Sequence, residues 1–240
     1  MTEQTPGKAV SAIEGPRRRQ VMLEVGGLYL ATLLAVRALV SIQATAGLPD
    51  WVLLGIPVLF IYVPILWLER KHLEPAEFGL ALEGLWPALK LNALLAFTIL
   101  GPFVLANHVY QGLLFGRHPQ WLLPERFWTE VVAYHILVVA LPEEFFYRGY
   151  MQSRLNQVFD RRWRFLGVPF GWSLFITAVL FAAGHSLVVV RWWHFSIFFP
   201  ALVFGWVREK TGNVLASALF HGLCNIVMVT LDTCYGVIPP

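Results

Sequence analysis

Leu141-Pro142-Glu143-Glu144-Phe145-Phe146-Tyr147-Arg148-Gly149-Tyr150 places two adjacent carboxylates and an arginine inside an apolar run that extends from Val131 to Leu155. If this run crosses a bilayer, each ionisable side chain near mid-depth costs about 2.5–3.5 kcal/mol to insert. Such groups persist mainly where they face a protein interior or a water-filled cavity. The stretch therefore indicates a functional site, and the rest of the chain is interpreted as the scaffold that holds partners against it.

The composition indicates a polytopic membrane protein. Of the 240 residues, 57% are hydrophobic and only 14% are charged, whereas soluble domains carry about 25% charged residues. No basic tract with interleaved aromatics is present, so the sequence does not indicate nucleic-acid binding. The two cysteines, Cys224 and Cys234, cannot form a disulfide framework.

We expect an all-α, polytopic transmembrane helix bundle of seven or eight spans, because an exposed strand edge cannot face lipid. The 108–127 segment has Gly, Pro and several aromatics and is interpreted as a loop with an interfacial piece. The chain is interpreted as one integrated domain, with a polar basic cytoplasmic tail (1–20), accessory spans (21–127) and a core that carries the polar motifs (128–235). Seven spans are predicted from the apolar runs, at about 21–42, 51–68, 85–107, 129–155, 166–190, 192–208 and 214–234.

The basic residues of the short loops predict the orientation. If the N-terminus lies inside, the outer loops hold only Arg117, Arg126 and Arg191. We therefore expect an integral protein of a prokaryotic cytoplasmic membrane, with a cytoplasmic N-terminus and, for seven spans, an outer C-terminus. Glu24 and Arg37 of the first span are expected to reach opposite interfaces by snorkelling. The inner segments hold Lys8, Arg17, Arg18, Arg19, Arg70, Lys71, Arg154, Arg161, Arg162, Arg164, Arg208 and Lys210.

Helical spacing pairs some of the polar residues of the motif. Glu144 and Arg148 are four apart and share a helical face, so they are expected to pair. Glu143 is offset from Glu144 by about 100° and projects elsewhere. One interpretation is that both glutamates serve a structural ion pair with Arg148. The other is that Arg148 needs only one carboxylate, which leaves Glu143 for chemistry.

Two later spans add polar side chains at the same spacing. Phe181 and His185 share a face, with small residues between them, and so do His221 and Asn225. A lone intramembrane histidine is more often a hydrogen-bonded packing residue than a catalyst. His194, beside Trp192 and Trp193, is assigned to an interfacial belt, and His135 is left without an assignment.

These residue types suit hydrolysis. A carboxylate and an imidazole on one water make a general-base pair, and imidazole and carboxamide donors can stabilise an oxyanion. The same atoms could bind Zn²⁺, but the HExxH signature of helix-borne zinc proteases is missing. No GxSxG motif is present either.

The three motifs resemble those of a known family when they are taken in order. Glu143-Glu144-x-x-x-Arg148, Phe181-x-x-x-His185 and His221-x-x-x-Asn225 are similar to the motifs of the CAAX-protease and bacteriocin-processing (Abi) family of intramembrane endopeptidases. The resemblance covers roughly residues 128–232. It implies a central catalytic cavity in which Glu143 activates water beside His185, His221 and Asn225 form the oxyanion site, and Glu144 and Arg148 support the first motif.

The resemblance implies a membrane-associated protein or peptide substrate, such as a sorting tag, a leader or a regulatory peptide. The family has been described both as metal-dependent and as glutamate-dependent. We favour the version without a cofactor, because an asparagine suits an oxyanion hole better than Zn²⁺ ligation. The alternatives are a zinc-dependent protease, a non-catalytic protein of the same fold that acts in bacteriocin immunity or as a scaffold, and an ion or proton transporter.

One geometric condition follows from the predicted spans. His185 lies near the outer end of its span, whereas His221 lies about 10–14 Å from the inner end of its own. The two histidines can meet only if the fifth span starts deeper, near Pro169, or if the helices tilt strongly.

Overall fold

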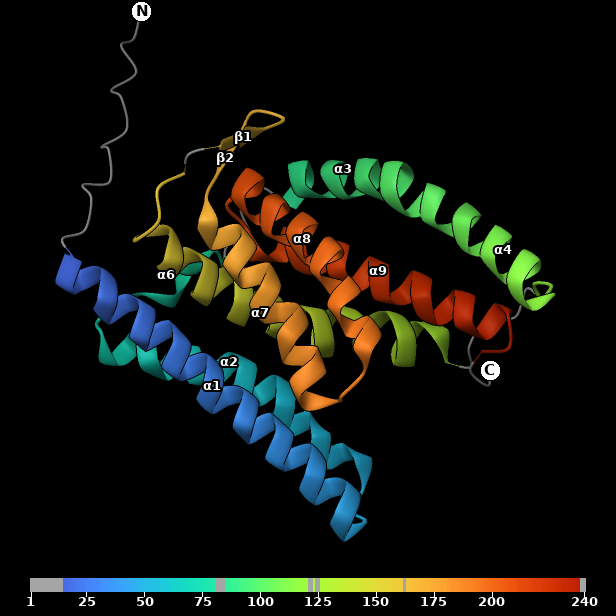
Figure 1. Ribbon diagram of the computed structural model, residues 1–240, viewed down its shortest axis with the longest axis horizontal. Helices are drawn as coiled ribbons and strands as arrows, with labels where there is room; N and C mark the ends of the chain where they lie inside the picture. Colours follow the sequence, from blue (N-terminus) through green and yellow to red (C-terminus); the bar gives the residue numbers. More distant parts are fainter. Residues whose placement is uncertain (1–14, 81–84, 121–122, 124–125, 162, 238–240) are drawn as a thin grey trace, which may run out of the picture.

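Helices arranged side by side make up nearly all of the architecture (Figure 1). The computed structural model describes residues 15–80, 85–120, 123, 126–161 and 163–237, so most of the predicted N-terminal tail lies outside the described residues. The elements are α1 (Gly15–Ala46), η1 (Asp50–Leu54), α2 (Gly55–Arg70), η2 (Pro75–Phe78), α3 (Leu85–Leu95), η3 (Ala96–Leu100), α4 (Gly101–Phe115), η4 (Phe127–Ala140), α5 (Leu141–Glu144), η5 (Phe145–Gln152), α6 (Ser153–Asn156), β1 (Trp163–Phe165), β2 (Val168–Phe170), α7 (Trp172–Val188), η6 (Trp192–Ile197), α8 (Phe198–Thr211) and α9 (Val214–Cys234).

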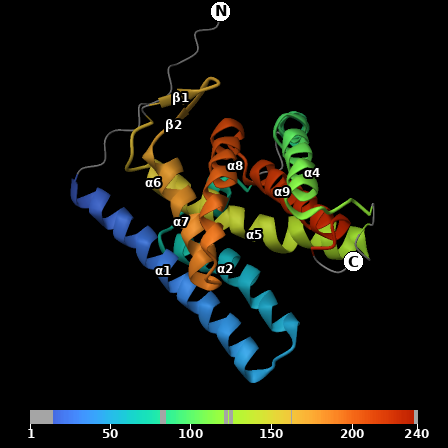
Figure 2. The same ribbon diagram turned by 45° about the vertical axis from the view of Figure 1, so that its right-hand side comes forward.

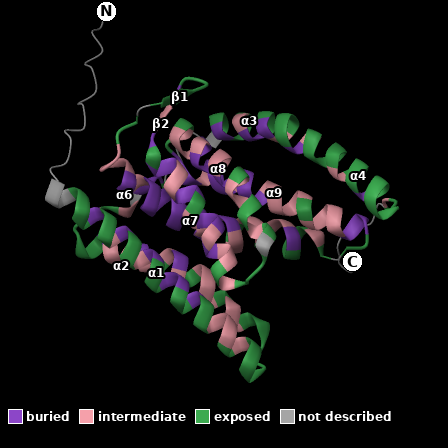
Figure 3. Ribbon diagram, in the orientation of Figure 1, coloured by how far each residue is buried: buried purple, intermediate pink, exposed green. Residues whose placement is uncertain are grey.

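Within the described residues, four segments are long and apolar enough to cross a membrane: Arg18–Ala46, Asp50–Arg70, Trp86–Phe115 and Val214–Cys234. Their outer faces expose large apolar side chains, such as Phe97 at 80%. Figure 3 shows this exposure along α1, α2, α3 and α4, whereas buried residues gather on the helices between them. A soluble protein rarely exposes such continuous apolar surface, so the fold is an all-α membrane bundle.

The third predicted span is longer than expected. α3, η3 and α4 follow one another without a break, and the helix ends at Gly116, which takes a left-handed conformation with φ of 62°. Glycine adopts this conformation without strain and commonly ends helices. The interpretation of the 108–127 segment as a loop is therefore wrong for residues 108–115.

The stretch that carries the glutamates lies in a continuous helical segment from Phe127 to Asn156. It has wide π-type turns on both sides of the short α5, in which Pro142 occupies one of the first two positions. Proline has no backbone N–H to donate, and π-type turns often mark functional sites. Side chains from Glu144 to Gln152 are all buried, so this segment lies at the centre of the bundle.

The fifth predicted span starts later than expected. Residues 163–170 form an antiparallel hairpin, with Trp163 opposite Phe170, before α7 begins at Trp172. Leu166 and Gly167 at the turn both have positive φ, at 48° and 78°, as a type I′ turn requires. This hairpin is a small addition to a helical fold. It moves the start of α7 past Pro169, which is one of the two conditions under which the two histidines were expected to meet.

The first two helices run antiparallel along one side of the bundle (Figures 1 and 2). Glu24 forms an ion pair of 3.0 Å with Arg154 on α6. Arg37 donates to the carbonyl of Val188, at 2.6 Å, at the end of α7. Both side chains therefore find partners on neighbouring helices, which the expectation of snorkelling did not include. These contacts join the accessory spans to the core.

Candidate functional site

A buried cluster joins the first and third motifs. Oε1 of Glu144 lies 3.1 Å from NH1 of Arg148 and 3.1 Å from Nδ1 of His221. The Glu144 side chain is 0% exposed, and that of Arg148 is 1% exposed. The predicted pairing of Glu144 with Arg148 is confirmed. Glu144 also orients His221. A carboxylate only accepts hydrogen bonds, so Nδ1 of His221 must be the donor.

Glu143 lies on the other side of the same imidazole. Its Oε2 is 3.9 Å from Nε2 of His221, and its side chain is 16% exposed. Both glutamates therefore reach His221, one from each ring nitrogen, although the helical offset predicted that they diverge. The two glutamate side chains project in different directions from their helix, and both can approach His221 because its two ring nitrogens are on different sides of the imidazole.

Two carboxylates and one guanidinium meet in this cluster. A buried charge is costly unless it is paired, and Arg148 pairs with Glu144. Glu143 instead lies beside Nε2 of His221, at 3.9 Å. The arrangement thus places a carboxylate and an imidazole next to each other.

Aromatic rings surround the Arg148 guanidinium. Its carbon lies 4.4 Å from the centre of the Phe181 ring and 5.5 Å from that of Phe204. NH2 also donates to the carbonyl of Ala201 on α8, at 3.0 Å. Cation–π contacts and a carbonyl partner are favourable for a cation that is removed from water. Arg148 is therefore held by three helices at once.

Phe181 connects the second motif to the cluster. Its ring centre lies 4.7 Å from that of His185 and 5.7 Å from that of His221. Nδ1 of His185 donates to the Phe181 carbonyl, at 2.9 Å, since a carbonyl can only accept. A neutral His185 therefore presents Nε2 as an acceptor. A Cβ on Gly184 would lie 2.7 Å from the Tyr147 hydroxyl, which shows how closely α7 approaches η5.

Only some of the predicted site residues are in contact with one another. Glu143, Glu144, Arg148 and His221 form one contact cluster, and His185 lies next to the Phe181 ring, which also neighbours His221. Asn225 is half-buried, one turn beyond His221 on α9. In the part of the chain that the structure describes, its side chain has no hydrogen bond. It is thus free to donate to a ligand.

Two residues beside the site were missed by sequence reasoning. Phe204 stacks on His221, with ring centres 4.6 Å apart and planes at 15°. His194 lies 6.1 Å from His185, edge to face, although it was assigned to an interfacial belt. Nothing in the sequence distinguishes Phe204 from the many other apolar residues. His194 could have been considered, because it is a titratable side chain in an apolar region.

The donor set was also tested for zinc. Among the described residues, no three His, Cys, Asp or Glu side chains are grouped so that they could hold a metal ion. Nδ1 of His221 is already engaged by Glu144, which leaves His221 and Glu143 as the nearest two donors. The side chains do not form the usual zinc set of three or four protein ligands.

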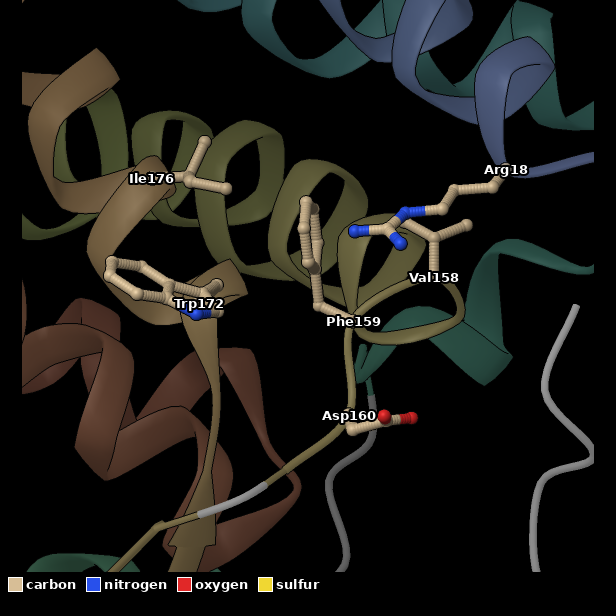
Figure 4. Close-up of a pocket in the computed structure, with 6 residues that line it drawn as sticks. All are labelled: Arg18, Val158, Phe159, Asp160, Trp172 and Ile176. Carbon is tan, nitrogen blue, oxygen red and sulfur yellow. The ribbon is translucent and has the colours of Figure 1, made fainter. Parts of the chain in front are cut away.

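A pocket of about 330 Å³ at the beginning of α1 contains none of the predicted site residues. Figure 4 shows its lining, with the Arg18 side chain extending toward Phe159 from α1. The guanidinium lies 4.9 Å from the centre of that ring. The contact ties the first helix to the end of the central segment, and this pocket is separate from the glutamate cluster.

A comparison with protein families finds one that matches the chain. The family model described as Type II CAAX prenyl endopeptidase Rce1-like matches residues 93–227, which is more than half of the chain and includes all three motifs. No curated protein and no solved structure matches the chain significantly.

Proposed function

The chain belongs to the Rce1-like family of type II CAAX prenyl endopeptidases, and from this premise we propose that Glu143 is the base that activates water for peptide hydrolysis in the membrane. At family level the chain is an intramembrane endopeptidase, an integral membrane protein that acts on a peptide substrate. The observation that carries the proposal is the position of His221 between the two carboxylates. A structural ion pair with Arg148 needs only Glu144, which leaves Glu143 for chemistry.

In the proposed reaction, Glu143 takes a proton from water while the water oxygen attacks the substrate carbonyl. His185 assists by accepting a hydrogen bond from that water through Nε2. The tetrahedral oxyanion receives hydrogen bonds from Nε2 of a protonated His221 and from the Asn225 carboxamide, as preorganised donors do in other acyl-transfer sites. Glu143 then gives its proton to the leaving amine as the C–N bond breaks. Glu144 and Arg148 position His221 and take no part in proton transfer.

We propose that residues 128–235 are the catalytic core and that the 21–127 spans are accessory. The pairing of Glu24 with Arg154 supports their integration into one domain. The proposed substrate is a sorting tag, a leader or a regulatory peptide. Peptidomics of membranes from cells with the wild-type protein should show processed C-terminal or leader peptides that are missing with Glu143→Gln. Identical peptide profiles would contradict the proposal.

We propose that the N-terminus is cytoplasmic and that the membrane is a prokaryotic inner membrane. Lysines at positions 71, 90 and 210 each lie over a tryptophan one turn earlier, at 5.3–5.5 Å, which is typical of an interface. On the predicted topology, all three lie on the cytoplasmic side. With seven spans the C-terminus should lie on the outer side of the membrane. A reporter enzyme that works only on that side should therefore be active when it is fused after Pro240. Activity of a reporter that works only in the cytoplasm would refute a count of seven spans.

Asn225→Ala is expected to lower the rate of cleavage by about 10²–10³-fold, the usual effect of removing one oxyanion donor. The side chain is half-buried and, in the described structure, unpartnered, so its removal should leave the thermal unfolding of the purified protein nearly unchanged. Cleavage of a fluorogenic peptide by protein in liposomes measures the effect. A variant with a wild-type rate would remove Asn225 from the oxyanion site.

A further inference from the structure

An apolar groove separate from the glutamate cluster opens between four elements. Its volume is about 420 Å³, and its lining includes Ile99 of η3, Leu166 of the hairpin turn, Leu174 of α7 and Trp206 of α8. Leu166 is 70% exposed and Ile99 is 38% exposed. Both Ile99 and the neighbouring Thr98 lie within the membrane-length segment Trp86–Phe115. The groove therefore adjoins the hydrocarbon region, and apolar chains are the molecules available to enter it.

A lysine ammonium, that of Lys210, lies at one end of the groove. The Trp206 ring lines the groove and donates from Nε1 to the Phe165 carbonyl, at 3.2 Å. Lys210, which is exposed, holds its ammonium 5.4 Å from the Trp206 ring centre. A ligand with its apolar part along the groove would meet the ammonium at the Trp206 end.

The neighbouring carboxylate does not neutralise this lysine. Glu209 is 5% exposed and pairs with Arg161 at 3.3 Å. Its other oxygen accepts hydrogen bonds from Gln152 and Asn156. The end of the groove is therefore positively charged and complements an anion.

We propose that this groove holds an acyl chain of an anionic phospholipid from the surrounding bilayer, with the lipid phosphate at Lys210. An apolar channel that ends at an unneutralised ammonium matches the two parts of such a lipid. The hairpin turn closes one side of the site, so the lipid holds β1 and β2 against η3 and α8. The groove lies beside α8, whose Phe204 stacks on His221, but the proposal concerns binding and does not rest on the proposed catalytic mechanism.

The test is native mass spectrometry of the delipidated full-length protein, titrated in detergent with phosphatidylglycerol or phosphatidylcholine. The wild type should bind one molecule of phosphatidylglycerol, with a higher affinity than it has for phosphatidylcholine. Lys210→Gln should weaken phosphatidylglycerol binding about fivefold, the usual contribution of one basic residue near an anionic lipid surface. Thr98→Phe, which fills the groove from an exposed position, should weaken binding of both lipids at this site by tenfold or more.

Two matched controls accompany these variants. Lys71→Gln removes an ammonium that lies over Trp67 in the same way but away from the groove, and Ala93→Phe adds the same ring to an exposed position that does not line it. Both should bind phosphatidylglycerol as the wild type does, and thermal unfolding should show that all four variants are folded. Equal binding of the two lipids, wild-type affinity in Lys210→Gln or in Thr98→Phe, or competitive displacement of phosphatidylglycerol by a lipidated substrate peptide would each overturn the proposal.

Discussion

Glu143→Gln is expected to abolish most of the hydrolytic activity, with a rate lower by about 10²–10⁴-fold, the usual contribution of a positioned general base. Glutamine keeps the size of the side chain and can still form hydrogen bonds, but it cannot take a proton from water. The variant also removes a negative charge from a mostly buried cluster, so its stability should be preserved. Initial rates on a fluorogenic membrane peptide, with protein at equal amounts in liposomes, measure the effect.

The matched control for this change is Glu130→Gln on the same helical segment. Glu130 is 58% exposed and pairs with Arg126, so its loss should leave the rate unchanged. A parallel assay with a chelator separates the mechanisms: a glutamate base keeps full activity in metal-free buffer. Activity that vanishes on chelation and returns with Zn²⁺ would turn these residues into ligands. A wild-type rate in Glu143→Gln would show that the hydrolytic base lies elsewhere.

Arg148→Met is expected to lower the free energy of unfolding by about 3–5 kcal/mol, the range for breaking a buried ion pair by removing one partner. The substitution leaves the fully buried Glu144 without its cation, and it also removes the hydrogen bond to the Ala201 carbonyl. The cation–π contacts with Phe181 and Phe204 are lost as well. Unfolding in mixed micelles, followed by circular dichroism, measures the change.

The control again comes from the exposed pair at the beginning of the same helical segment. Arg126→Met breaks a contact whose partners are 75% and 58% exposed, and it should cost less than about 1 kcal/mol. The double variant Glu144→Gln with Arg148→Met should recover part of the lost stability, because no buried charge is left unpaired. If Arg148→Met unfolds as the wild type does, then Glu144 is compensated by another group and the ion pair is not what holds His221.

Local features of the chain were predictable from its sequence. The apolar runs indicated membrane helices, and the last span, 214–234, agrees with α9 residue for residue. The spacing of Glu144 and Arg148 predicted their pairing because both lie on one helix, whose geometry sets which side chains meet. The order of three short polar motifs was enough to indicate the family, since polar residues on apolar helices are rare and each one is informative.

Contacts between helices were decided only by the tertiary structure. The sequence could not show that His221 lies between Glu143 and Glu144, because that depends on how α9 is rotated and shifted against α5. It did not indicate Phe204, which is one aromatic residue among many, or the pairing of Glu24 with Arg154 across the bundle. Helical periodicity determines which residues share a face, whereas close packing between helices determines which faces meet.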